Sequence, residues 1–344
     1  MVPIQDWKFD AADRMCLEYL KGFIPDKIID VHVHLFKKRF IQAYIDSCES
    51  VFSLYPRDEL GYEKACYLQE CIYGPLNDYR IVGLPMPDHP QICLENGLRN
   101  EYAAWMAVEA NRNPGKLAGA ILVMPDDTED DIERMLALSP GLVGLKCYQW
   151  FAPRLSEATM DEFLPESAWR VADHKGLPVV VHLARQGTIA DADNLAQVMQ
   201  KTRDYPNARL ILAHCGTSFI GHLLGDVINE LKKRDNIWLD LAAVCEPSVM
   251  FEGIKGLGSS RVLWGTDFPI SMGKGRCVSL GAGFLWMSKH NLCGLAEQEA
   301  TGGVGLYVVE ELMAFYQACR MLELSETDRE KIFYNNAKEL FFSK

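Results

Sequence analysis

Residues 27–34, with the sequence Lys-Ile-Ile-Asp-Val-His-Val-His, set the architecture expected for this chain. The β-branched run before the histidines is typical of a buried strand. Side chains at positions i and i+2 of a strand share one face, so His32 and His34 are expected to project side by side. Two imidazoles at that spacing can hold one metal ion. The structural alternative for each is a core histidine satisfied by hydrogen bonds.

Short apolar runs that end in a residue able to bind a metal or exchange a proton recur later in the chain. They cover residues 142–146, 177–182, 210–214, 237–240 and 262–267. Their last residues are Lys146, His182, His214, Asp240 and Asp267. The intervals between these last residues are 36, 32, 26 and 27 positions. Because one strand and its crossover helix take about 30 residues, the intervals indicate successive βα units.

Helical patterns separate several of these strands, at 166–175, 191–202 and 219–233. Two further strands are expected earlier, at 81–84 and 117–124, and each is followed by a proline. Together with residues 27–34 they make eight strands, which predicts an α/β protein with a (β/α)8 barrel. In that fold the functional side chains lie at the C-terminal ends of the strands, around one mouth. All of the candidate residues occupy such positions.

The ordered set of motifs resembles the amidohydrolase superfamily of metal-dependent barrels. It consists of the strand-1 His-x-His, Gly-Leu-Lys at 144–146, a histidine ending each of the next two strands and Gly-Thr-Asp-Phe-Pro at 265–269. The chain is most similar to the amidohydrolase-2 branch, which contains the carboxymuconate-semialdehyde and resorcylate decarboxylases and various lactonases. The resemblance extends to Asn-Ala-Lys-Glu-Leu-Phe at 336–341.

The resemblance implies one divalent metal ion per chain, Zn or otherwise Mn, Fe or Co, held by His32, His34, His182 and Asp267. Asp267 is then also a catalytic residue. So is His214, either as an acid–base group or as a ligand of a second metal. In some members of the superfamily a strand-4 lysine is carboxylated and bridges two metals, and Lys146 stands at that position. A second metal would therefore involve Lys146.

Basic and aromatic residues follow several of the predicted strand ends. Arginine binds carboxylates through two parallel hydrogen bonds, so Arg185 and Arg154 point to a substrate that bears a carboxylate. Tyr148 and Trp150 are candidates for an apolar wall of the pocket. The alternative for the arginines is a solvated loop charge, and for the aromatic residues it is packing beneath the loop.

The composition is acidic, with 47 Asp and Glu against 35 Lys and Arg and a net charge of −12. This argues against nucleic-acid and anionic-membrane partners. No run approaches the roughly 20 apolar residues of a membrane span, and the N-terminus lacks a signal-peptide pattern. The 11 cysteines are scattered and have no Cys-x-x-Cys spacing. We therefore expect a cytoplasmic protein acting on a small molecule, and the superfamily implies a homo-oligomer, as a dimer.

The whole chain, residues 1–344, is expected to form one domain with three segments outside the core barrel. Residues 1–24 are predicted to be a lead-in with an N-terminal helix, and residues 35–80 an insertion over the mouth. Residues 272–305 are glycine-rich and are predicted to form a lid-like loop or a dimer contact.

These features predict a metal-dependent hydrolase that attacks a small, carboxylate-bearing substrate with a metal-activated water. The alternative is a metal-dependent decarboxylase of an aromatic or unsaturated acid that uses the same residues. Released carbon dioxide indicates the second, and solvent oxygen in the product indicates the first. A third reading is a catalytically silent barrel that uses the metal for stability. It predicts that restored metal gives no turnover.

Overall fold

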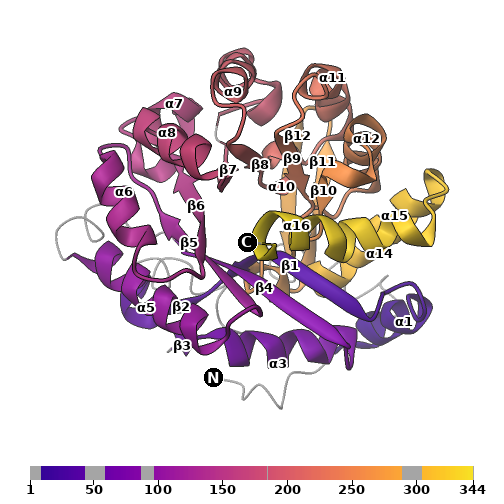
Figure 1. The fold of residues 1–344 in the computed structure, drawn as a ribbon. Coiled ribbons are helices and arrows are strands. Elements are labelled where there is room, and N and C mark those ends of the chain that lie inside the picture. The colour runs from indigo at the N-terminus through magenta and orange to yellow at the C-terminus, as the bar shows by residue number, and fades with distance from the viewer. Residues whose placement is uncertain (1–8, 43–58, 87–96, 184, 289–303, 344) are drawn as a thin grey trace.

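The computed structural model describes residues 9–42, 59–86, 97–183, 185–288 and 304–343. Its centre is an eight-stranded parallel sheet in the order β1-β4-β5-β6-β7-β8-β9-β10 (Figure 1). The strands are β1 (Lys27–His34), β4 (Asp78–Leu84), β5 (Leu117–Leu122), β6 (Leu142–Tyr148), β7 (Pro178–His182), β8 (Arg209–Leu212), β9 (Ile237–Asp240) and β10 (Val262–Leu263). Each corresponds to a strand predicted from the sequence.

Backbone hydrogen bonds between β1 and the segment beyond β10 close this sheet into a barrel. The Val31 N–H donates to the Trp264 carbonyl at 3.0 Å, and the His34 N–H donates to the Phe268 carbonyl at 2.7 Å. Val33 and Phe268 form a parallel bridge in the same place. The predicted (β/α)8 barrel is confirmed, and the carboxyl ends of its strands meet at one mouth.

Helices surround the strands, as Figure 1 shows. The crossover helices are α3 (Tyr62–Tyr73), α5 (Leu98–Arg112), α6 (Glu129–Leu136), α8 (Glu166–Lys175), α9 (Ala192–Asp204), α11 (Gly221–Leu231) and α12 (Pro247–Leu257). Short helices α7 (Met160–Phe163) and α10 (His214–Thr217) follow β6 and β8. The terminal helices are α1 (Ala11–Tyr19), α14 (Tyr307–Met321), α15 (Glu326–Glu330) and α16 (Asn336–Phe342), and a π-helical turn (Lys331–Asn335) joins the last two. None of the helices in the described ranges is long and apolar enough to cross a membrane.

An irregularity in β1 changes which face of the strand its side chains occupy. Asp30 pairs with Ile81 and Val33 pairs with Gly83, so β1 advances three residues while β4 advances two. This is a β-bulge, which inserts one extra residue and re-aims the side chains that follow it. Side chains on either side of the bulge therefore no longer follow one simple alternation.

The bulge places apolar side chains and histidines of β1 on the same, inner face. Ile29 and Val31 belong to the apolar cluster inside the barrel, which α16 closes at one end with Phe341 and its neighbours. Asp30 instead hydrogen-bonds Gln69 of the outer helix α3. Beyond the bulge, the ring of His32 lies close to the ring of a histidine that follows β8. Without the extra residue, His32 would share the outer face with Asp30.

The segment predicted as an insertion, 35–80, contains a small hairpin and one ordinary crossover helix. Strands β2 (Phe36–Lys37) and β3 (Glu59–Leu60) pair antiparallel, and α3 leads into β4. Residues 43–58 lie outside the described residues, so the prediction that this segment covers the mouth stays a prediction.

The glycine-rich segment 272–305 is more regular than its composition predicts. Strands β11 (Gly275–Leu280) and β12 (Gly283–Ser288) form an antiparallel hairpin within the segment predicted to be a lid-like loop or a dimer contact, and either role stays a prediction. Gly281 makes the turn with φ of +61°, a conformation that glycine adopts without strain. The glycines therefore end and reverse strands here. Residues 289–303 lie outside the described residues.

Candidate metal centre

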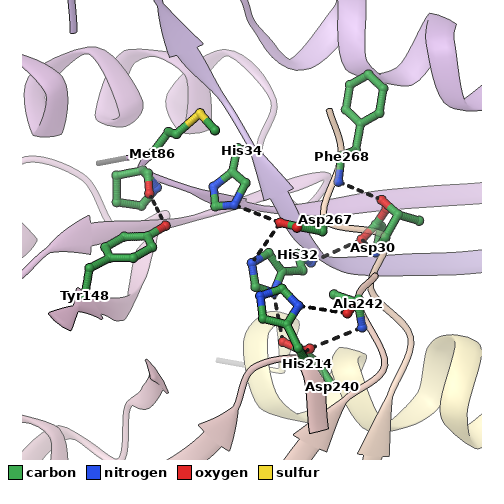
Figure 2. A network of polar contacts seen from close by, with 12 residues as sticks. Asp30, His32, His34, Met86, Tyr148, His214, Asp240, Ala242, Asp267 and Phe268 are labelled. Atoms are coloured by element: carbon green, nitrogen blue, oxygen red, sulfur yellow. Dashed lines mark hydrogen bonds and ion pairs between the residues drawn. The ribbon is translucent and has the colours of Figure 1, made fainter. Parts of the chain in front are cut away.

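Three predicted ligands converge at the mouth of the barrel: His32 and His34 of β1, and Asp267 beyond β10 (Figure 2). The Asp267 Oδ1 lies 3.0 Å from His34 Nε2 and 3.5 Å from His32 Nε2. All three residues are buried, and one ligand atom from each lies within 4.8 Å of the others. Asp267 reaches this position from the loop, because β10 ends four residues earlier than predicted.

The nitrogen atoms of this group suit a divalent cation. His32 Nε2 and His34 Nδ1 are buried and have no hydrogen-bond partner among the described residues. Burying such atoms without a partner is costly, and two imidazoles with a carboxylate are a donor set that Zn, Mn and Fe accept. Burial and the nearby Lys146 charge hold the pKa of His32 well below its ordinary value. The ring is therefore neutral, which is the form that binds a metal.

A buried threonine and a second carboxylate hold Asp267 in place. Thr266 donates its hydroxyl to Asp30 Oδ2 at 2.6 Å and its backbone N–H to Asp30 Oδ1 at 3.0 Å. Burial on its own would raise the pKa of Asp267, but the His34 hydrogen bond and the charge of His214 hold it below its ordinary value. Asp267 is therefore ionised, as a metal ligand or proton acceptor must be.

Asp240, the last residue of β9, supports His32 from behind the centre. Its Oδ2 lies 2.9 Å from His32 Nδ1, and both side chains are almost completely buried. An ionised carboxylate only accepts hydrogen bonds, so this contact places the ring proton on Nδ1. His32 Nε2 is left with its lone pair toward Asp267. Metal-binding histidines are commonly oriented by a carboxylate in this way.

His214 lies beside His32, with the two ring centroids 4.8 Å apart. Since β8 ends at Leu212, His214 stands in the following turn and adopts φ of +53°. Its Nδ1–H donates to the Ala242 carbonyl at 2.8 Å, so Nε2 is the nitrogen free to act. This position fits either role predicted for His214, as an acid–base group or as a ligand of a second metal.

His182, the fourth predicted ligand, lies next to His214 with ring centroids 5.2 Å apart. Its Nδ1 lies 3.2 Å from the Gln149 Oε1. The structure does not include His182 in the group of three whose ligand atoms lie within 4.8 Å of one another. It is brought to the centre, and its role as a ligand stays a prediction.

Lys146 of β6 is fully buried, and its Nζ has no hydrogen-bond partner among the described residues. The ammonium lies 4.7 Å from the ring centroid of Tyr148. Burial lowers the pKa of Lys146 to about 8, although Asp240 and Asp267 oppose the shift. Lys146 is therefore a buried cation that contacts the Tyr148 ring and is close enough to Asp240 and Asp267 to feel their charges.

The two aromatic residues predicted to line the pocket do lie together. Tyr148 and Trp150 are stacked, with centroids 5.8 Å apart and planes inclined by 8°. Tyr148 also lies 6.3 Å from the His182 ring and donates its hydroxyl to the Pro85 carbonyl at 2.9 Å. One face of the centre therefore has an aromatic wall.

The two predicted carboxylate-binding arginines are engaged with acidic side chains of this chain. Arg154 forms an ion pair with Glu162, and Arg185 contacts Asp191 at 3.1 Å and Asp193 at 2.7 Å. A substrate carboxylate would have to replace these partners.

Sequence reasoning missed Asp240, Gln149 and the pair Asp30–Thr266 as members of the site. Asp240 did carry a signal, because it ends a predicted strand as the ligands do. The only sequence signal for Gln149 and Thr266 is that they stand next to aromatic and acidic candidates in the chain. Their hydrogen bonds join residues far apart in the chain, such as the 208 positions between His32 and Asp240.

The barrel and its buried His-His-Asp group define a metal-dependent barrel enzyme. The family model described as Amidohydrolase matches residues 29–342, and the chain belongs to this family. No curated protein shows significant sequence similarity to the chain.

Solved structures with this fold come from several bacteria. A 5-carboxyvanillate decarboxylase from Novosphingobium aromaticivorans, in complex with manganese and a nitrobenzoic acid, has a TM-score of 0.58 at 12% identity, covering 92% of this chain and 96% of its own. A 2,6-dihydroxybenzoate decarboxylase from Rhizobium gives 0.57 at 13% identity, with 92% and 98% covered. A protein described as a 2-pyrone-4,6-dicarboxylic acid hydrolase from Pseudomonas putida gives 0.52 at 15%, with 92% and 97% covered. At these identities the likeness shows the fold.

Proposed function

We propose that the protein is a hydrolase of a small organic substrate bearing a carboxylate, dependent on a divalent ion held by His32, His34 and Asp267, with His182 as a further ligand. The observation that carries this proposal is the convergence of the three buried side chains with a neutral, unpartnered His32 Nε2. A divalent ion in such a site polarises a substrate oxygen and acidifies water.

The residues of the chain have distinct parts in this reaction. Asp267 is ionised and can accept the proton of the attacking water at its carboxylate, then return it to the leaving group. When both of its nitrogens are protonated, His214 can direct Nε2–H at negative charge on the substrate, since Nδ1–H is bound to the Ala242 carbonyl. Tyr148, which stacks on Trp150 and lies beside His182, is a candidate for an apolar wall of the substrate site.

A decarboxylase of an aromatic or unsaturated acid is the second candidate. Two of the structures named above are decarboxylases of hydroxybenzoate-type acids, and one holds manganese. The stacked Tyr148 and Trp150 also offer a flat apolar surface to an aromatic ring. In this reaction a protonated group of the chain must deliver a proton to carbon, and His214 is the candidate closest to the ligands.

Elemental analysis of protein purified without chelator tests the metal centre. We expect about one ion of Zn, Mn, Fe or Co per chain, because the two His-His-Asp groups of the described residues, His32–His34–Asp267 and His32–His214–Asp240, share His32. About two ions per chain would bring Lys146 into the site as a carboxylated ligand. No metal, with none taken up from added Zn or Mn, would contradict the proposal.

Isotope labelling separates the two candidate reactions. The metal-loaded protein is incubated in ¹⁸O-water with lactones and with hydroxybenzoic and unsaturated carboxylic acids. Hydrolysis places ¹⁸O in the product, whereas decarboxylation releases carbon dioxide and places a solvent proton on carbon.

Light scattering on the same preparation tests the predicted dimer.

A further inference from the structure

Asp240 divides its two carboxylate oxygens between two different histidines (Figure 2). Oδ2 accepts the Nδ1–H of His32 at 2.9 Å. Oδ1 accepts the backbone N–H of His214 at 2.7 Å and that of Ala242 at 3.2 Å. The carboxylate is fully buried, so water cannot substitute for any of these donors. One side chain therefore contacts both the metal-binding and the acid–base part of the centre.

The backbone around His214 needs such support. His214, Cys215 and Thr217 have φ values of +53°, +54° and +57°, and Gly216 between them has +76°. A non-glycine residue in this conformation is strained and persists only where its surroundings hold it. The hydrogen bond from the His214 N–H to Asp240 is one such restraint.

The direction of the His214 ring depends on Asp240 a second time. The ring donates Nδ1–H to the Ala242 carbonyl at 2.8 Å, and the Ala242 N–H is itself bound to Asp240 Oδ1. Asp240 thus fixes both the backbone from which the ring projects and the residue whose carbonyl orients the ring.

We propose that Asp240 is a positioning residue that couples His32 to His214: one carboxylate sets the tautomer of the metal-binding imidazole and the orientation of the acid–base imidazole 4.8 Å away. This inference rests on the proposed function, because it assigns the two histidines to ligation and proton transfer. In this assignment Asp240 acts through the two imidazoles.

The chemistry requires a carboxylate at this position. Three N–H groups converge on two oxygens, so every contact needs an acceptor. An asparagine offers one oxygen and one NH₂ group. If the oxygen faces His32, the NH₂ opposes the two backbone N–H groups. If it faces the backbone, the NH₂ forces the His32 proton onto Nε2, where the metal should bind. Asp240→Asn therefore breaks one half of the coupling in either orientation.

Long-range ¹H–¹⁵N spectra of the imidazoles test this directly, on the protein as purified and after chelation. In the wild type, we expect His32 and His214 both to carry their protons on Nδ1. In D240N, we expect the signals of at least one of the two rings to change, according to the direction in which the amide faces, and metal affinity to fall about 10- to 100-fold where the His32 tautomer changes. We also expect the pH profile of turnover to shift, which a loss of stability alone would not produce.

Asp13→Asn is the matched control. Asp13 is equally buried and accepts backbone N–H groups of Asp10 and Leu306, but it lies in α1 and contacts none of the centre's residues. We expect D13N to lower the melting temperature and to leave both imidazole spectra and metal affinity unchanged.

Several outcomes would overturn the coupling. A wild-type spectrum in which Nδ1 of either histidine carries no proton does so without any variant, and it decides the matter if D240N fails to fold. Unchanged spectra of both rings in D240N, or equal changes in D13N, also do so. If the wild type binds no metal, the proposed function fails, while the tautomers still report whether Asp240 orients both rings.

Discussion

The two sides of the barrel mouth are built differently. On the side formed by β1, β9 and β10, the carboxylates Asp30, Asp240 and Asp267 are buried, and each is bound by named N–H or O–H groups. On the side formed by β6 and β7, Lys146 has no hydrogen-bond partner within the part of the chain that the structure describes, and Arg185 pairs with acidic residues of its own loop and helix. The first side, which we call the fixed side, holds its atoms in one arrangement, as a metal requires. The second side, which we call the open side, carries charged side chains that can take a substrate group as a partner, as substrate binding requires.

The largest expected effect comes from removing a ligand on the fixed side. His34→Ala deletes the nitrogen that lies 3.0 Å from Asp267, and we expect metal content and turnover to fall to the level of a chelated sample. Arg134→Ala, at an exposed position of α6, is the control and should retain both. Full metal content in H34A would show that the ion binds elsewhere.

Lys146 tests whether the open side contains a ligand. Its pKa drops from 10.5 to about 8 in the fold, so Lys146→Met should raise the unfolding free energy of the metal-free protein by about 3 kcal/mol at pH 7. Because the folded-state pKa is lowered, this gain is complete below pH 8 and disappears as the pH rises toward 10.5. Denaturation at several pH values measures it. Loss of metal in K146M would instead identify a carboxylated lysine.

A substitution of Glu311, in α14, tests the fixed side. Its effect on stability should depend on pH in the opposite direction to that of Lys146→Met. It is fully buried, its oxygens lack hydrogen-bond partners among the described residues, and burial with Asp30, Asp267 and Asp240 raises its pKa well above the ordinary value. The fold must then take up a proton that the unfolded chain has lost above about pH 4.5. Glu311→Gln should therefore stabilise the protein by about 1–3 kcal/mol at pH 8.

The pH dependence supplies the control for Glu311→Gln. The stabilisation should shrink as the pH falls toward 4.5, where the unfolded chain also protonates. Thermal unfolding at pH 5 and pH 8 gives the comparison. An equal gain at both values would assign it to packing.

The smallest effect on stability is expected at Arg185. Its ion pairs with Asp191 and Asp193 are partly exposed, so Arg185→Ala should change the unfolding free energy by less than about 1 kcal/mol. If Arg185 binds the substrate carboxylate, KM rises while kcat is unchanged. An unchanged KM would remove Arg185 from the substrate site.

Much of the fold was predictable because βα units repeat locally. Apolar runs and helical patterns correctly gave eight strands, and the His-x-His spacing correctly placed His32 and His34 on one face. The errors lie where strands stop: β8 and β10 end before His214 and Asp267. The hairpin at 275–288 was not predicted. Strand ends depend on neighbouring strands and on closure, which no local pattern records.

The sequence by itself determines which residue types form the centre, because metal ligands and acid–base groups end successive strands. The barrel then brings these strand ends together at one mouth. The bulge that turns His32 inward, the sharing of Asp240 between two histidines and the pairing of Arg185 with Asp191 arise only when the barrel closes. Periodicity is a property of neighbouring residues. Hydrogen-bond partners 208 positions apart are a property of the closed barrel.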